Sequence, residues 1–343
     1  MYPVTQGQGR GKLVESSVVV RDLRKVYEPS PPWMRFLVRS NLTHDVVALD
    51  GIDFEVGPGE IMAVVGPNGA GKSTAFRILV GLTSPTSGTA NVMGFDCASQ
   101  SKQVRRMVGW MPAEDRSLLL RLSCRENLRF HARLHNISFR DLDQSISTVL
   151  ADVGLTEFAD DTPFALSAGM RARLQLARAL LHHPRVLILD EPTGSVDPVA
   201  AHTLLELITE IVAERQIAAL ISSHRLEEIE ALHSHVVLLD RGAVRYDGDL
   251  DELRKEWDLA RVELGFTNGE VASSVASTLK ASNHLETVSQ AGDSVTVTLK
   301  PTSRIADVLN ALGSDVADLL HIRDLRTPLR DILASMYGSR TDP

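Results

Sequence analysis

The chain is 343 residues long, enough for one large domain and one smaller domain. Its apolar content of 43% and charged content of 23% are typical of a folded globular protein, and a formal net charge of −8 argues against a surface built mainly to bind nucleic acid. Two cysteines are too few for a disulfide framework or a cysteine-built metal site, and no apolar run approaches the ~18 residues that cross a bilayer.

The N-terminal part of the chain predicts two strands on either side of an unusual insert. Apolar runs at 18–23 and 46–56 are typical of strands. The insert at 28–45 begins with three prolines, which break regular structure, and continues as an apolar stretch that contains Arg35 and Arg39. We find no signal peptide ahead of these elements and expect a cytosolic protein.

A glycine-rich stretch between a strand and a helix carries the strongest signal in the chain. The apolar run at 61–65 predicts the strand, and periodic apolar residues after Lys72 predict a helix that ends at Gly81. The pattern G-x-x-x-x-G-K-[ST] between them predicts a phosphate-binding loop, because backbone N–H groups and the helix dipole converge on an anion there. Lys72 would contact the β- and γ-phosphates of a nucleotide, and the Ser73 hydroxyl would ligate Mg²⁺. The loop comprises Gly66, Pro67, Asn68, Gly69, Ala70, Gly71, Lys72, Ser73 and Thr74.

The middle of the chain predicts a helical insert. Residues 108–123 show no regular pattern, and a capping box formed by Ser123 and Glu126 begins a helix. The apolar side of that helix is predicted to comprise Leu128, Phe130, Leu134 and Ile137. A second helix of the insert is expected over 139–156.

Two short apolar runs predict strands buried on both faces, as in a parallel sheet. They end in chemically useful side chains: Asp190 and Glu191 end the run at 186–191, and His224 follows the run at 218–223. We expect all three beside the phosphate loop, at the carboxyl ends of neighbouring strands. The other predicted elements are helices at 171–182 and 199–213 and a hairpin at 235–246.

These side chains suit phosphoryl transfer to water. Asp190 is placed to orient Mg²⁺ or its water ligand. Glu191 can polarise a water molecule for in-line attack on the γ-phosphate, and His224 can contact that phosphate. A single histidine at the end of a strand is usually structural, but the accompanying motifs favour a functional role here.

Beyond residue 255 the pattern changes to a β-α-β-β-α-β-α order, which predicts a small two-layer domain. Its predicted elements are a strand at 261–266, a helix at 270–280, a hairpin over 285–299, a helix at 305–312 and a last helix that begins at Thr327.

In their order and spacing, the phosphate loop, 166–170, 186–191, 195–198 and His224 resemble the motifs of an ATP-binding-cassette (ABC) ATPase. The resemblance covers roughly residues 15–250. It implies an α/β P-loop NTPase cassette at 15–255, with a RecA-like core and antiparallel β and helical subdomains, followed by a small α+β domain at 256–343. It also implies ATP and Mg²⁺ as ligands.

The resemblance assigns further roles. Tyr27 would stack on adenine, and Asp197 would lie in a loop that communicates between two sites. Residues 166–170 would be the signature loop, in which Ser167 and Gly169 meet the γ-phosphate of ATP bound to a second copy of the chain. The loop departs from Leu-Ser-Gly-Gly-Gln at positions 168 and 170, and we expect activity to survive. A homodimer would then hold two complete ATP sites.

The usual Mg²⁺-binding glutamine of the family is absent. Ala113 or Glu114 falls at its place, and Glu114 could substitute as a metal ligand. The loop is one residue longer than usual, so both assignments stay open.

The C-terminal domain resembles that of prokaryotic exporter ATPases that pair with a separate permease. This implies a peripheral protein at the cytoplasmic face of the membrane, with a transmembrane permease as partner and no nucleic acid. The insert at 28–45 either docks against the permease or the membrane, or forms a β-hairpin loop that packs its own apolar residues. The alternative function is a non-transport ABC ATPase that acts on nucleic acid or the ribosome.

Overall fold

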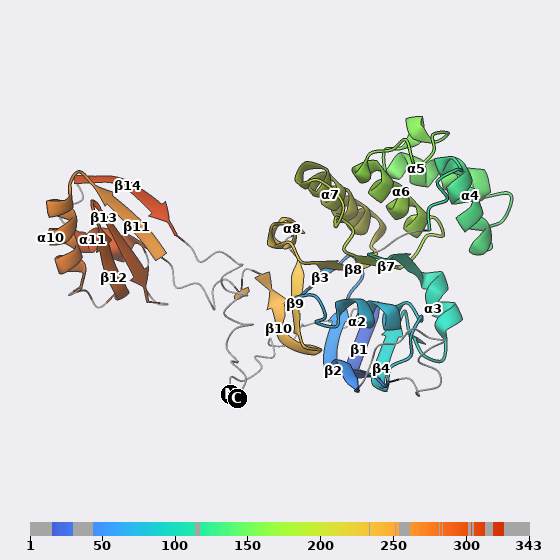
Figure 1. Ribbon diagram of the computed structural model, residues 1–343, viewed down its shortest axis with the longest axis horizontal. Coiled ribbons are helices and arrows are strands. Elements are labelled where there is room, and N and C mark those ends of the chain that lie inside the picture. The colour runs from blue at the N-terminus through green and yellow to red at the C-terminus, as the bar shows by residue number, and fades with distance from the viewer. Residues whose placement is uncertain are drawn as a thin grey trace. The chain divides into compact units, whose positions relative to one another are not determined.

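The computed structural model describes residues 16–29, 44–113, 117–232, 234–250, 252–253, 261–280, 284–300, 305–312 and 318–325, together with residues 282 and 303. They belong to two compact units, Met1–Leu250 and Asp251–Pro343 (Figure 1). Three expectations lie outside the described residues: most of the insert at 28–45, the carboxylate of Glu114, and the last helix after Thr327.

The first unit contains an antiparallel sheet in the order β2-β1-β4-β5. Val18 of β1 lies opposite Val56 of β2 on one side and Val92 of β4 on the other, and all three side chains are fully buried. The strands are β1 (Val18–Tyr27), β2 (Val46–Val56), β4 (Ser87–Val92) and β5 (Phe95–Asp96). The predicted strands at 18–23 and 46–56 are therefore confirmed.

A second sheet of six strands has the order β10-β9-β3-β8-β7-β6. All its pairings are parallel except that of β10 with β9. The strands are β3 (Ile61–Val65), β6 (Val108–Met111), β7 (Val186–Asp190), β8 (Ala218–Ser223), β9 (His235–Asp240) and β10 (Ala243–Asp249). The expectation of irregular structure across 108–123 is wrong for β6. Four residues are too few to show a period, and pairing with β7 makes them a strand.

Both faces of the six-stranded sheet are covered, which explains the continuous apolar runs in β7 and β8. Leu187 and Leu189 of β7 belong to a core shared with helices α4 to α7. Val186 and Ile188 point the other way, into a core shared with α2 and the antiparallel sheet. Figure 1 shows these two layers on opposite sides of the sheet. The doubly buried parallel strands were predicted correctly.

The helices of this unit mostly follow the predicted ranges. Helix α6 begins three residues before the expected Arg171, because Ser167 caps it. The helices are α2 (Lys72–Leu79), α3 (Ser101–Met107), α4 (Cys124–Leu134), α5 (Leu142–Asp152), the 3₁₀ helix η1 (Thr156–Phe158), α6 (Ala168–Leu180), α7 (Pro198–Arg215) and α8 (Leu226–Leu232).

Helix α4 begins as predicted but turns a different face inward. The capping box is present: the Ser123 hydroxyl accepts from Glu126 N, and Glu126 accepts from Ser123 N. Phe130 and Leu134, however, are 45% and 63% exposed. The buried face is Cys124, Asn127, Leu128 and Ala132.

Asn127 is the reason for this rotation. Its side chain donates to the carbonyls of Leu119, Leu122 and Ser123 and accepts from Leu119 N, so it closes the loop ahead of the helix from inside. A hydropathy pattern assigns an asparagine to the exposed side of a helix, and it therefore predicts the wrong buried face for α4.

The second unit is a split β-α-β domain of the ferredoxin-like type. Its four antiparallel strands have the order β12-β13-β11-β14. Both helices contribute to the same core as the strands, so they cover one face of the sheet. The elements are β11 (Arg261–Phe266), α10 (Gly269–Lys280), β12 (Leu285–Ala291), β13 (Ser294–Leu299), α11 (Ile305–Leu312) and β14 (Leu319–Asp324).

The capping box of α4 gives a direct test of this fold. Ser123→Ala removes the acceptor for Glu126 N, and we expect the free energy of unfolding to fall by about 1 kcal/mol. Ser123→Asp keeps an acceptor at that position and should change it by less than about 0.5 kcal/mol. Denaturant titrations followed by circular dichroism measure both changes. Equal losses in the two variants would contradict the capping role.

Candidate nucleotide-binding site

The loop between β3 and α2 is held against two other strands, and this requires glycine. A Cβ on Gly66 would lie 2.3 Å from the carbonyl oxygen of Leu239 in β9. Gly71 has a φ of +109° and caps α2, and a Cβ there would lie 2.5 Å from the carbonyl oxygen of Ala48 in β2. The loop therefore presents backbone groups, rather than side chains, at the N-terminus of the helix.

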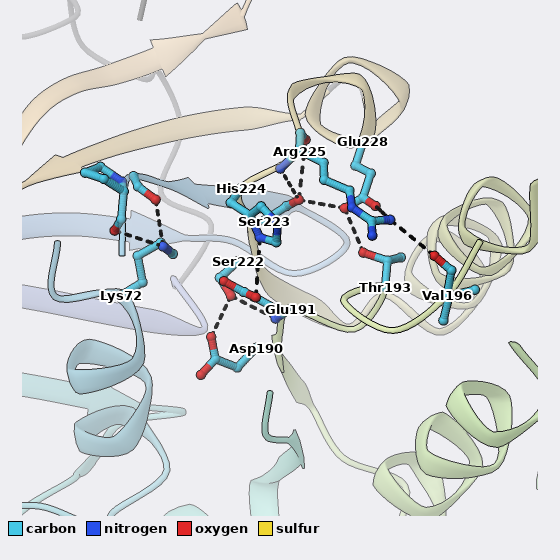
Figure 2. A network of polar contacts seen from close by, with 12 residues as sticks. Lys72, Asp190, Glu191, Thr193, Val196, Ser222, Ser223, His224, Arg225 and Glu228 are labelled. Carbon is cyan, nitrogen blue, oxygen red and sulfur yellow. Dashed lines mark hydrogen bonds and ion pairs between the residues drawn. The ribbon is translucent and has the colours of Figure 1, made fainter. Parts of the chain in front are cut away.

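Lys72 places a buried positive charge inside this loop. The residue is 5% exposed, and its Nζ donates to the carbonyl oxygens of Gly66 at 2.7 Å and Pro67 at 3.3 Å (Figure 2). Burial lowers its pKa, while the carboxylates of Glu191 and Asp190 oppose that shift. A buried ammonium inside a loop of backbone donors is suited to an anionic ligand such as a triphosphate.

Ser222, the last residue but one of β8, organises the two carboxylates. Its hydroxyl donates to Asp190 Oδ1 at 2.6 Å and accepts from the backbone N of Glu191 at 2.9 Å. The order of the sheet places β8 between β3 and β7, so β7 is not a direct neighbour of the phosphate-loop strand. The predicted side chains meet at one edge of the sheet, as expected. The strand that links them is β8, which carries Ser222 and precedes His224.

Glu191 directly follows the last residue of β7, and its backbone conformation directs its side chain toward His224. Its φ is +51°, a left-handed value that costs a non-glycine residue on the order of 1 kcal/mol. Its Oε2 lies 3.4 Å from His224 Nδ1, with side chains 25% and 50% exposed respectively. The strained backbone thus directs the carboxylate toward the histidine, where it remains accessible to water.

The donor set fits Mg²⁺ bound together with a nucleotide. No group of three or more His, Cys, Asp or Glu side chains that could hold a metal occurs in the described part of the chain. Mg²⁺ binds through one or two carboxylates, water and substrate phosphates. Asp190 and the hydroxyl of Ser73, in the first turn of α2, supply such a partial set.

Tyr27 ends β1 and pairs with Val46 of β2. Two residues further along β2, the carbonyl of Ala48 faces Gly71 of the phosphate loop. The ammonium of Lys25 lies 5.1 Å from the centre of the tyrosine ring. The structure therefore places Tyr27 on the strand pair beside the loop, with a cation over its ring.

The signature segment and the segment of Asp197 pack together. The hydroxyl of Ser167 accepts from Met170 N at the start of α6, and Asp197 Oδ1 accepts from Ala200 N at the start of α7. A Cβ on Gly169 would lie 3.0 Å from the Cβ of Ala200, so glycine permits this close approach of the two helix N-termini. Both polar side chains have a capping role within the chain.

A cavity of about 640 Å³ connects these segments with the candidate catalytic carboxylate. Glu191 lines it from the position just after β7, Ala168 from α6, Ser195 from the loop before α7, and Ala113 from the loop after β6. Of the two residues considered for the second metal-ligand position, Ala113 contributes only a methyl group to this cavity, and the choice between Ala113 and Glu114 stays open. Glu114 lies outside the described residues.

Sequence reasoning did not identify Glu228. Its side chain joins the segment that follows Glu191 to the segment that contains His224. Its carboxylate accepts from the hydroxyls of Thr193 and Ser223. A signal was present, because Glu228 lies beside the apolar residues Ile229 and Leu232, with which it forms the buried face of α8. An acidic residue within an apolar stripe indicates a paired, buried carboxylate.

A separate cavity of about 340 Å³ lies where α2, α3 and β6 meet α4 and α6. Three of its lining residues are histidines, and the rings of His135 and His182 stack with their centres 4.0 Å apart. Burial lowers the pKa of both residues, that of His182 to about 4. The remaining lining residues are Val80, Leu82, Arg105, Val108, Trp110, Pro112, Ser117, His131, Arg178 and Ala179.

Comparisons with known proteins give one consistent result. A family profile described as ABC transporter matches residues 49–194. The chain is 38% identical to the Nod factor export ATP-binding protein I of Cupriavidus metallidurans, over 61% of this chain and 68% of that protein. It is 38% identical to the bacitracin transport ATP-binding protein BcrA of Bacillus licheniformis, over 61% of this chain and 67% of that protein. The solved structure of cbiO1 from Clostridium perfringens, part of the ABC transporter complex cbiONQ, matches with a TM-score of 0.60 and 26% identity over 69% of this chain and 90% of that chain.

The stacked histidines make the stability of the chain depend on pH. The pKa of His182 falls from its ordinary 6.5 to about 4 on folding, so the unfolded chain binds the proton more readily. Stability is complete above pH 6.5 and decreases as the pH falls toward 4, by about 3 kcal/mol from this residue. His182→Gln, which keeps a donor for the Val108 carbonyl, should flatten the dependence of Tm on pH.

The neighbouring His183 is exposed and provides the matched control, His183→Asn. Asparagine tolerates the left-handed φ of +53° at that position. Calorimetry between pH 4 and 7.5 compares the two. The interpretation fails if His183→Asn flattens the profile as much as His182→Gln does.

Proposed function

The chain belongs to the ABC transporter ATP-binding proteins, and from this membership we propose that it is the ATP-hydrolysing subunit of an exporter. It would dimerise on binding MgATP and drive a conformational change in a separate transmembrane permease. The observation that carries the proposal is the meeting of Lys72, Asp190 and the Glu191–His224 pair at one edge of the sheet.

Each residue has a distinct role in the proposed reaction. Lys72 and the backbone donors of its loop bind the phosphates, while Ser73 and Asp190 hold Mg²⁺. When bound, Mg²⁺ neutralises charge on the phosphate oxygens. Glu191 orients a water molecule and accepts its proton, and His224 keeps the carboxylate in place through their contact of 3.4 Å.

Exposed apolar side chains beside the signature segment support an interface with a second copy. Phe164 is 82% exposed and lies three residues before Ser167. Val199 is 79% exposed and lies two residues after Asp197. Large apolar side chains exposed next to polar motif residues are typical of surfaces that become covered. A second chain placed there would bring Ser167 and Gly169 toward its partner's phosphate loop.

The cavity of about 340 Å³ is the surface we propose for the permease. Val80 and Leu82, just after α2, line it, and α2 begins at the phosphate loop. Leu82 is 59% exposed. A partner segment seated there would sense movement of the helix that holds the nucleotide. No helix among the described residues is both long and apolar enough to span a bilayer. Binding to this partner would hold the protein at the cytoplasmic face of the membrane.

The direction of transport is proposed from two relatives. One is named for Nod factor export and the other for bacitracin transport. The alternative, an ABC ATPase that acts on nucleic acid or the ribosome, is less well supported, because the chain carries a net charge of −8.

Substitution of the candidate catalytic carboxylate tests hydrolysis and dimerisation together. Glu191→Gln should lower the rate of ATP hydrolysis by about a hundredfold or more, because the general base is lost. With hydrolysis blocked, MgATP should raise the mass measured by light scattering from 37.5 kDa to twice that value. A Glu191→Gln protein that stayed monomeric in excess MgATP would refute the dimer.

Substitutions at the proposed dimer interface, compared with a control substitution elsewhere on the surface, test where that interface lies. Adding Phe164→Asp and Val199→Asp to Glu191→Gln should abolish the MgATP-dependent dimer while ATP binding persists. Phe139 is 80% exposed on the loop between α4 and α5 and serves as the control. Phe139→Asp should leave the dimer intact, and loss of the dimer in this control would remove the assignment.

Permease docking is tested by purification from membranes of the native host. The tagged chain should co-purify with a polytopic membrane protein, identified by mass spectrometry, rather than with DNA or ribosomes. Leu82→Glu places a charge at the proposed docking cavity and should reduce that recovery at least tenfold, whereas Phe139→Glu should not. Equal recovery with both variants would exclude the cavity as the docking surface.

A further inference from the structure

Glu228 is a buried carboxylate whose hydrogen bonds come from three side chains. It lies on α8 and is 7% exposed. Its Oε2 accepts from Thr193 Oγ1 at 2.7 Å and from Ser223 Oγ at 2.6 Å, and its Oε1 accepts from Arg225 Nη1 at 3.2 Å (Figure 2). A buried carboxylate is stable only when it is paired and hydrogen-bonded, and these contacts meet both needs.

Two of its partners flank His224 directly in the chain. Ser223 precedes His224 and Arg225 follows it. The hydroxyl of Ser223 also accepts from the backbone N of Arg225 at 3.0 Å, which closes a tight turn around the histidine. Glu228 therefore holds the backbone on both sides of His224.

The other contacts reach the segment that contains Glu191 and Asp197. Thr193 lies two residues after Glu191. Arg225 Nη1 also donates to the carbonyl of Val196, which precedes Asp197, at 3.3 Å. Through these contacts, α8 ties the turn at His224 to the loop between β7 and α7. Figure 2 shows Glu228 between the two segments.

The position of the His224 ring depends on this backbone. Its side chain is 50% exposed, and Glu191 is its one ion-pair or hydrogen-bond partner among the described residues. Because half of the side chain is exposed, the turn formed by Ser223 and Arg225 is an important constraint on where the ring lies. A small displacement of that turn would change the 3.4 Å contact with Glu191.

We propose that Glu228 is a positioning residue for hydrolysis, which holds the turn of His224 and the loop 191–197 as one rigid unit. The proposal rests on the proposed ATPase function and deepens it. Glu228 itself is buried and acts on the Glu191–His224 pair through Ser223, Arg225 and Thr193. Because none of these four residues belongs to the phosphate loop, their loss should lower kcat and leave KM for ATP largely unchanged.

Thr193 allows the mildest test, since valine has nearly the same shape without the hydroxyl. Thr193→Val in the full-length chain should lower kcat roughly tenfold, as expected for a small misplacement of a reacting group, with KM changed less than about twofold. Thr193→Ser restores the hydroxyl and should recover most of kcat. Thr209→Val, which removes a hydroxyl bonded to the Leu205 carbonyl on α7, is the matched control and should match the wild type.

A double variant asks whether Glu228 acts through His224. Glu228→Gln should lower kcat roughly tenfold to a hundredfold, and His224→Ala should lower it at least as much. If Glu228 positions His224, the double variant should be about as slow as His224→Ala alone. Multiplied effects would overturn the proposal. Thermal unfolding of each variant completes the set: a lowered Tm with kcat unchanged well below it would show a stabilising role alone and would also overturn the proposal.

Failure of the ATPase function itself would look different. The wild-type chain and Glu191→Gln are measured alongside, and their difference tests hydrolysis without involving Glu228. Hydrolysis by the wild type that Glu191→Gln abolishes, with Thr193→Val unchanged, would overturn the role of Glu228 alone. Absence of hydrolysis in the wild type would overturn the proposed function and this inference with it.

Discussion

The arrangement of the site depends on two hydrogen bonds made by the Ser222 hydroxyl. It joins the carboxylate of Asp190 to the backbone of Glu191 across two parallel strands. This is possible because β8 lies between the strand of the phosphate loop and the strand of the carboxylates. The buried charge of Lys72 therefore meets the candidate metal ligand and the candidate general base at one edge, although more than a hundred residues separate Lys72 from those two carboxylates in the chain.

The same sheet separates two cores that serve different purposes. In one core, α2 packs against the antiparallel sheet, and this packing holds the phosphate loop in place. The other binds the helices that carry Ser167 and Asp197. The cavity of about 340 Å³ lies where the two layers meet and reaches the C-terminal end of α2, whereas the cavity of about 640 Å³ lies on the side of the helical layer and reaches Glu191. A movement of the residues that contact the nucleotide can thus reach either cavity through a single helix or loop.

Several features could be predicted from local sequence because local physics controls them. The capping box at Ser123 and the continuous apolar runs of β7 and β8 depend on neighbouring residues and on burial of both faces. The buried face of α4 could not be predicted. Asn127 turns inward to bond the backbone of a preceding loop, and only the folded loop creates that demand. The strand Val108–Met111 likewise exists because β7 lies beside it.

For the site, the sequence by itself determined which chemical groups are available: a glycine-rich loop with Lys72 and Ser73, and acidic residues and a histidine at the ends of apolar runs. These residue types have few other reasons to occur in that order. Only the tertiary structure decided how they are connected. It placed β8 in the middle, gave Glu191 its left-handed backbone, and buried Glu228 between the two segments. The physical reason is that a buried carboxylate is stable only among partners brought together from separate elements, and no local pattern encodes that meeting.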